Sequence, residues 1–178
     1  MGELILKAPG MPDMLVSLYD QYKLLEPCRP WEGEPDRAEW VEADTGLHGR
    51  IIRNEITHTL CGYVGVTSGE LFGVNYNDLV VLDDGWDDYS PYGGFTYSGW
   101  GAAGCDKSGV WWFGFDCAHS EDFLPGIYIK MRMVNHSGKD SWPPTTNYRT
   151  WEFVDAEIRK MMEGIALGKY RVEEEKDE

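Results

Sequence analysis

The chain has 178 residues, which suits a single domain that buries enough surface to fold without a disulfide or a structural metal. Its formal net charge of −15 comes from 31 acidic and 16 basic residues. Because phosphate backbones and anionic membranes repel such a chain, we expect no direct nucleic-acid binding and no membrane association.

The four cysteines predict reduced thiols rather than a disulfide framework. Cys28, Cys61, Cys105 and Cys117 include no CxxC pair of the kind that binds zinc. The first residues lack the basic segment that opens a signal peptide, and no apolar run reaches membrane-spanning length. We therefore expect a cytoplasmic protein that needs no cofactor.

The N-terminal part of the chain predicts one short helix and then a loop. Over residues 13–25 the apolar side chains fall at helical spacing, and Asp13 stands at the N-cap position. Residues 31–37 are charged and contain a proline, which favours a loop.

A pair of strands is predicted next. Residues 50–53 and 59–66 are rich in β-branched and aromatic side chains, which indicates two strands of a hairpin or meander. Gly62 and Gly65 lie inside the second strand, where they indicate a bulge or the close approach of another backbone segment.

Three further strands are predicted in the middle of the chain, at 80–82, 93–98 and from 110 to 115. Residues 127–134 alternate between apolar and polar or aromatic side chains, which favours a fourth strand at an edge of a sheet. Over 149–167 the apolar positions recur at helical intervals and predict the C-terminal helix.

Runs of strands followed by a helix are typical of an α+β fold. We expect a mainly antiparallel sheet with the C-terminal helix packed on one face and a short helix at the N-terminus. Residues 1–170 should form one domain, and residues 171–178 an acidic tail.

The end of the strand at 110–115 gathers several ionisable residues beside aromatic ones. If the chain turns there, Asp116 lies beside His119, and an Asp–His pair suits a general base or a clamp for a hydrogen-bonded ligand. The candidate ligand-binding residues, none of them assigned a catalytic role, are Trp111, His119, Asp116, Tyr97, Tyr92, Arg53 and Asp122.

The aromatic residues favour a nucleotide-like ligand. A nucleobase gains about 1–3 kcal/mol by stacking on one ring, and Arg53 has the forked donors that pair with phosphate. Three other interpretations stay open. The scattered histidines give little support to a metal site, Cys117 could act as a nucleophile beside His119, and Asp116 and His119 could simply cap a turn.

Five motifs resemble a family of small uncharacterised proteins of tailed phages and prophages. They are Ile52-Arg53-Asn54, LCGYVGV at 60–66 (which includes GYVGV), GGFTY at 93–97, WWFGFDCAH at 111–119 with Asp122, and Tyr148-Arg149 before the last helix. Family members usually carry a histidine where this chain has Tyr92, and a His-Pro turn near residues 70–73 that this chain lacks. These departures put any histidine chemistry of the relatives in doubt here.

The resemblance implies a phage accessory protein, and such proteins often counter host defences. We therefore expect a protein of the host cytoplasm that binds and sequesters a small nucleotide-like signalling molecule in an aromatic pocket. Two alternatives are a hydrolase of such a signal that uses His119 with Asp116, and an acidic decoy that inhibits a host defence protein. The half-exposed aromatic strand is also compatible with a homodimer.

Overall fold

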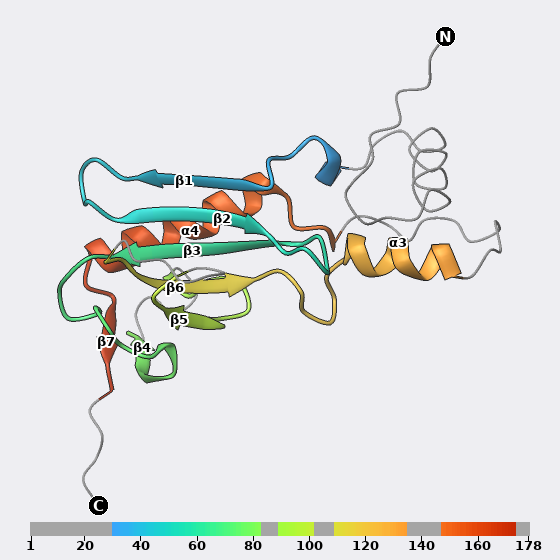
Figure 1. The fold of residues 1–178 in the computed structure, drawn as a ribbon. Coiled ribbons are helices and arrows are strands. Elements are labelled where there is room, and N and C mark those ends of the chain that lie inside the picture. Colours follow the sequence, from blue (N-terminus) through green and yellow to red (C-terminus); the bar gives the residue numbers. More distant parts are fainter. Residues whose placement is uncertain (1–29, 83–88, 102–108, 135–146, 174–178) are drawn as a thin grey trace, which may run out of the picture.

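The computed structural model describes residues 30–82, 89–101, 109–134 and 147–173. These residues form an α+β fold, a five-stranded antiparallel sheet with the C-terminal helix packed against it, as the sequence predicts (Figure 1). The predicted helix over 13–25 lies outside the described residues. No helix within the described ranges is long and apolar enough to cross a membrane.

The strands of the main sheet follow the order β1–β2–β3–β6–β5, and every neighbouring pair is antiparallel. The two edges are β1 (Arg37–Val41) and β5 (Tyr97–Gly99). Between them lie β2 (His48–Arg53), β3 (Leu60–Val66) and β6 (Trp111–Asp116). Three of the predicted strands are thereby confirmed as the centre of the sheet.

The first strand is not anticipated by the sequence, which predicts only a loop at residues 31–37. That segment holds a short 3-10 helix, η1 (Pro30–Glu32), and runs directly into β1. The exposure of β1 alternates, with Arg37, Glu39 and Val41 exposed and Ala38 and Trp40 half-buried. Such alternation suits an edge strand with one solvated face. The segment is missed because it lacks the apolar run that marks a buried strand.

A second, two-stranded sheet joins β4 (Leu79–Val81) to β7 (Tyr170–Val172), and the short helix η2 (Tyr76–Asp78) leads into it. The strand predicted at 80–82 is confirmed within one residue. Because β7 reaches residue 172, the ordered fold extends past residue 171, where the sequence predicts the start of the acidic tail.

Helix α4 (Trp151–Ala166) covers one face of the sheet and starts after Thr150, whose hydroxyl caps the first turn. Gly62 of β3 lets the helix come close, because a Cβ at this position would lie 2.5 Å from Phe115 and 3.0 Å from Val154. The sequence predicts a bulge or a close backbone approach at Gly62, whereas the atoms that lie close to it belong to side chains. The buried side of α4 consists of Val154, Ile158, Met161, Met162 and Gly164.

Residues 125–134 form a helix, α3 (Pro125–Val134), so the edge strand predicted at 127–134 is wrong. Pro125 occupies the first helical position, where its fixed φ suits the helix and its missing N–H is not needed. The Gly126 N–H then donates to the Thr57 carbonyl at 2.8 Å, which ties the helix to the turn between β2 and β3. α3 projects from the end of the sheet, and its residues belong to neither of the two described sheets (Figure 1).

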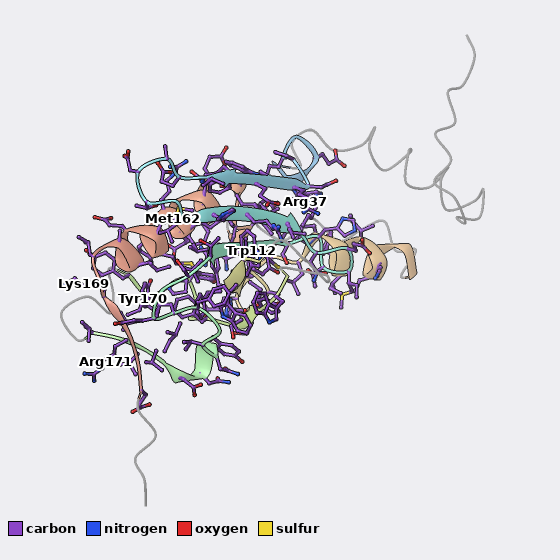
Figure 2. All side chains as sticks on the ribbon, turned by 60° about the vertical axis from the view of Figure 1, so that its left-hand side comes forward. Arg37, Trp112, Met162, Lys169, Tyr170 and Arg171 are labelled. Carbon is purple, nitrogen blue, oxygen red and sulfur yellow. The ribbon has the colours of Figure 1, made fainter. Side chains whose placement is uncertain are left out.

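Consecutive tryptophans at the start of β6 face opposite sides of the sheet, as strand geometry requires. Trp111 packs against the main core between sheet and α4, whereas Trp112 belongs to a second cluster with Tyr63. Trp112 is fully buried, and the Arg50 guanidinium lies 4.0 Å from its ring centroid. Figure 2 shows Trp112 within the dense group of side chains at the centre of the molecule.

Candidate functional site

The candidate site lies at the end of the sheet where β6 ends and α4 begins. The loop that follows β6 carries His119 and Asp122, and Arg149 directly precedes the N-cap residue of α4. A turn brings Tyr92 to the same place, because the Tyr92 N–H donates at 2.8 Å to the carboxylate of Glu157 on α4. Three segments far apart in the sequence therefore meet here.

Asp122 organises this site as a fully buried carboxylate. Its Oδ2 accepts a hydrogen bond from the His119 backbone N–H at 2.9 Å and lies 3.3 Å from the His119 ring Nδ1. Its Oδ1 accepts from Arg149 Nε at 3.0 Å and from the Tyr92 hydroxyl at 2.8 Å. A buried carboxylate is stable only when it is paired and hydrogen-bonded, and Arg149 supplies the opposite charge.

Arg149 and Tyr92 also contact each other directly. Arg149 Nη2 donates to the Tyr92 hydroxyl at 2.8 Å, and the guanidinium lies 4.4 Å from the centroid of the Tyr92 ring. Burial, followed by the hydrogen bond to Asp122, raises the pKa of Tyr92, so this hydroxyl stays neutral. Burial opposes the charge on Arg149, but hydrogen bonds to Tyr92 and Asp122 raise the pKa of Arg149 overall.

The His119 ring is partly exposed, and its Nε2 edge lies against Gly93. The His119 side chain is 33% exposed. Because a carboxylate can only accept, the contact with Asp122 assigns a proton to Nδ1, and Nε2 then carries a lone pair in the neutral ring or a second donor in the charged ring. Among the described residues, no hydrogen-bond partner faces Nε2. Gly93 packs against this edge of the ring, since a Cβ at position 93 would lie 2.1 Å from Nε2.

The carboxylate beside His119 is Asp122, not the Asp116 that the sequence predicts. Asp116 is the last residue of β6, and its Oδ1 accepts from the Ala118 backbone N–H at 3.0 Å. Asp116 thus caps the turn that follows the strand, whereas His119, the other residue of the turn-capping alternative, turns its ring nitrogen to Asp122. The expected spacing of three residues is kept, but it joins His119 to Asp122, three residues later, and not to Asp116, three residues earlier.

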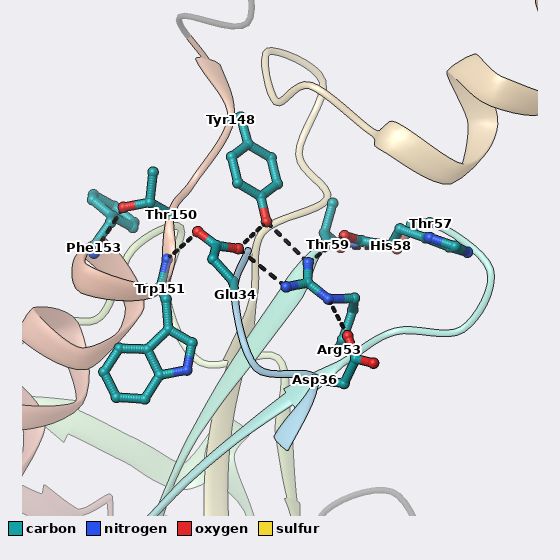
Figure 3. Close-up of polar contacts among 10 residues, drawn as sticks. All are labelled: Glu34, Asp36, Arg53, Thr57, His58, Thr59, Tyr148, Thr150, Trp151 and Phe153. Carbon is teal, nitrogen blue, oxygen red and sulfur yellow. Dashed lines mark hydrogen bonds and ion pairs between the residues drawn. The ribbon is translucent and has the colours of Figure 1, made fainter. Parts of the chain in front are cut away.

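Arg53 lies in a separate network at the same end of the sheet (Figure 3). Its guanidinium donates to Glu34 at 3.1 Å, to Asp36 at 2.7 Å, to the His58 carbonyl at 3.0 Å and to the Tyr148 hydroxyl at 2.9 Å. The Arg53 side chain is only 8% exposed. A phosphate would have to displace two carboxylates to reach it, so this geometry gives Arg53 a structural role.

The two predicted aromatic residues of the sheet lie away from His119. Trp111 starts β6, roughly 17 Å of extended chain before Asp116, and its Nε1 donates to the Val74 carbonyl at 2.9 Å. Tyr97 contacts Tyr63 edge to face at 5.8 Å, on the side of the sheet opposite α4. Of the predicted aromatic residues, only Tyr92 is brought to the site.

A hollow of about 600 Å³ adjoins Arg53 rather than His119. The residues that line it include one arginine and four carboxylates, so its charge does not favour a phosphate. Its described lining consists of Arg53, Trp31, Ile52, Asn54, His58 and the acidic residues Glu32, Glu34, Asp36 and Glu55.

The nucleophile and metal interpretations find little support in the geometry. Cys117 is buried, and burial raises the pKa of its thiol far above neutrality, which keeps it protonated. Among the described residues, no three His, Cys, Asp or Glu side chains are grouped to hold a metal ion. His136 lies outside the described residues.

Arg149 is the site residue that sequence reasoning misses. It follows Asp122 by 27 residues, and no local pattern links the two positions. The only signal was the place of Tyr148-Arg149 among the motifs of the resemblance, which gives no role to either residue.

Comparisons of the chain with protein-family models, with curated proteins and with solved structures found no match. The function is therefore argued from the geometry of the site. In that geometry the partly exposed imidazole of His119 and guanidinium of Arg149 are each held by one oxygen of the buried Asp122 carboxylate. The Arg149 donors suit an anionic group, and an unprotonated Nε2 of His119 would suit proton transfer.

Proposed function

We propose that this protein binds a small phosphate-bearing, nucleotide-like molecule through His119 and Arg149 and holds it unchanged. The observation that carries the proposal is the attachment of both side chains to Asp122, at 3.3 Å for His119 Nδ1 and 3.0 Å for Arg149 Nε. Because the carboxylate already restrains both side chains, binding immobilises little that was free before.

Arg149 supports an anionic ligand. It neutralises Asp122, so this pair carries no net charge in a chain whose net charge is −15. Arginine donors pair well with phosphate oxygens, and the Arg149 side chain is 27% exposed.

The aromatic contribution is smaller than the sequence suggests. The Arg149 guanidinium lies over the Tyr92 ring at 4.4 Å, and the His119 and Phe153 rings pack against Tyr92 nearly at right angles. Trp111 and Tyr97 lie elsewhere in the fold. The proposal therefore rests on recognition of phosphate groups rather than on a base stacked in an aromatic pocket.

Calorimetric titration with ADP-ribose, followed by heat release and mass spectrometry of the ligand, tests the proposal. We expect binding that Arg149→Ala weakens about tenfold or more, the size of a lost charge-assisted hydrogen bond, and recovery of the intact ligand. Arg159→Ala is the matched control, because Arg159 is a more exposed arginine that pairs with Asp155 on the outer side of α4. Equal affinities of the two variants would contradict the proposal.

A hydrolase of the same ligand is the second candidate. It is favoured by the orientation of His119, because Asp122 holds Nδ1 and no hydrogen-bond partner of Nε2 is found among the described residues. In this case the ligand recovered after incubation would be cleaved, and His119→Gln would stop the cleavage while Arg149 still supported binding.

The biological role that we propose is the sequestration of a nucleotide signal of host defence by a phage accessory protein. It is supported by the resemblance of the GYVGV, GGFTY and WWFGFDCAH motifs. Expression of the chain in bacteria with a nucleotide-signalling defence should restore phage growth. The same experiment with Arg149→Ala should give no rescue at equal protein level.

A further inference from the structure

The residues on either side of Arg149 are bound by one carboxylate from a distant part of the chain. Glu34 Oε2 accepts a hydrogen bond from the Tyr148 hydroxyl, and Glu34 Oε1 accepts from the Trp151 backbone N–H at 2.8 Å. Figure 3 shows the Glu34 carboxylate between these two groups. Arg149 thus lies in a short segment that is fixed at both ends.

Glu34 is itself firmly held. Arg53 Nη2 donates to its Oε2 at 3.1 Å, and the side chains of Glu34 and Arg53 are 11% and 8% exposed. Arg53 ends β2 in the centre of the sheet, and its Nη1 also donates to the His58 carbonyl at 3.0 Å. The segment before α4 is therefore anchored through Glu34 to the rigid sheet.

The Glu34 carboxylate also suits the start of α4 electrostatically. The first N–H groups of a helix have no partner within the helix and favour a negative charge nearby. Glu34 binds the N–H of Trp151, the first residue of α4, while Thr150 caps the N–H of Phe153. The backbone from Tyr148 to Trp151 has little freedom while these bonds are present.

We infer that Glu34 is a positioning residue for Arg149. By holding Tyr148 and Trp151, it directs the guanidinium toward Asp122 and fixes the ligand-binding face of the site. The inference rests on the proposed function for its consequence in binding. The positioning itself is a property of the protein without ligand.

The first test measures positioning directly, by NMR of the Arg149 Nε–H group in the free protein. The Arg149 Nε–H group donates a hydrogen bond to Asp122 Oδ1, so the exchange of its hydrogen with water should be slow. Glu34→Gln keeps the shape but replaces one acceptor oxygen with a donor, and we expect exchange about three- to tenfold faster, the effect of one lost hydrogen bond. Tyr148→Phe is the second variant, should Glu34→Gln not fold.

Ile158→Val is the control for stability. It removes one methyl group from a fully buried residue of α4 and leaves the Glu34 network intact. Exchange at Arg149 that is equally fast in Ile158→Val and Glu34→Gln would overturn the inference, because Glu34 would then act only through general stability.

The second test is a double-mutant cycle on ADP-ribose affinity. If Glu34 acts through Arg149, Glu34→Gln weakens binding about three- to tenfold in the native chain and has no further effect in the Arg149→Ala background. Additive effects would overturn the inference. If Arg149→Ala binds as tightly as the native chain, the proposed function fails, and the NMR comparison still decides whether Glu34 positions Arg149.

Discussion

Asp122 binds His119 twice, through the backbone N–H at 2.9 Å and through the ring Nδ1 at 3.3 Å. The backbone bond closes the turn after β6, and the ring contact sets the direction of the imidazole. One buried carboxylate therefore shapes the loop and orients its exposed side chain. The same carboxylate also binds Arg149 and Tyr92. The stability of this end of the fold and the geometry of the site therefore depend on the same two oxygens of Asp122.

Asp122→Asn should be clearly more destabilising than Asp116→Asn. The first change leaves Arg149 facing a neutral group in a buried position, and we expect a loss of about 2–3 kcal/mol in the free energy of unfolding. Asp116 uses one oxygen to cap a turn, and asparagine keeps that oxygen, so its replacement should cost within about 0.5 kcal/mol. Urea unfolding of both variants measures the difference, and similar midpoints would show that the Asp122 network contributes little.

Gly93→Ala and Gly94→Ala form a matched pair that probes the packing around His119. Both glycines have positive φ, 69° and 86°, so an alanine strains the backbone at each position by about 1 kcal/mol. Only at Gly93 does the added Cβ meet the His119 ring, while at Gly94 it meets open space.

We therefore expect Gly93→Ala to lose roughly 1–3 kcal/mol more than Gly94→Ala, the usual cost of overpacking. The NMR signals of the His119 ring should shift strongly in Gly93→Ala alone. Unchanged ring signals there would mean that the imidazole does not rest against Gly93.

Trp111→Ala and His119→Ala should separate folding from binding. Trp111 packs against the main core and its Nε1 bonds to the Val74 carbonyl, so its truncation should cost about 3–5 kcal/mol of stability. Because Trp111 lies at the opposite end of β6, the affinity of the folded protein for ADP-ribose should not change. His119→Ala should weaken the binding of ADP-ribose and leave the free energy of unfolding nearly unchanged. A loss of affinity in folded Trp111→Ala would instead support the aromatic pocket that the sequence predicts.

Local patterns predict the centre of this fold well. β2 and β3 are rich in β-branched residues, and α4 has apolar residues at helical spacing, so each element is marked by its own sequence. The alternation at 127–134 was misleading, because it fits a half-buried strand and gives no weight to Pro125 at the start of a helix. For β1 the neighbours decide, since Glu39 pairs across the sheet with Arg50.

The site is only partly legible from the sequence for the same reason. His119 and Asp122 are close along the chain, so their proximity is predictable. Asp116 lies equally close to His119 in the sequence, so spacing alone does not decide between the two carboxylates. Arg149 and Glu34 reach the site through the fold alone. Arg53 has the donors for phosphate, but only the structure shows that Glu34 and Asp36 already occupy them.

The thiol of Cys61 should react slowly at neutral pH. Burial, followed by the nearby charge of Asp116, raises the pKa of Cys61 to about 11, so at pH 8 about one molecule in a thousand carries the reactive thiolate. The reagent would be a disulfide such as Ellman's reagent, used on a variant with Cys28 and Cys105 replaced by serine. The rate should rise about tenfold per pH unit from pH 8 to 10.

The same shift predicts the direction of a stability change. The folded pKa of Cys61 lies above the ordinary thiol value of 9.0, so ionisation favours the unfolded chain. Its contribution to stability is complete below pH 9 and is lost as the pH rises toward 11. Cys117 should stay unreactive until the protein unfolds, because it is buried and its pKa is raised further. Rapid reaction of either thiol in the folded protein at pH 8 would instead identify an activated cysteine and return the nucleophile next to His119 to consideration.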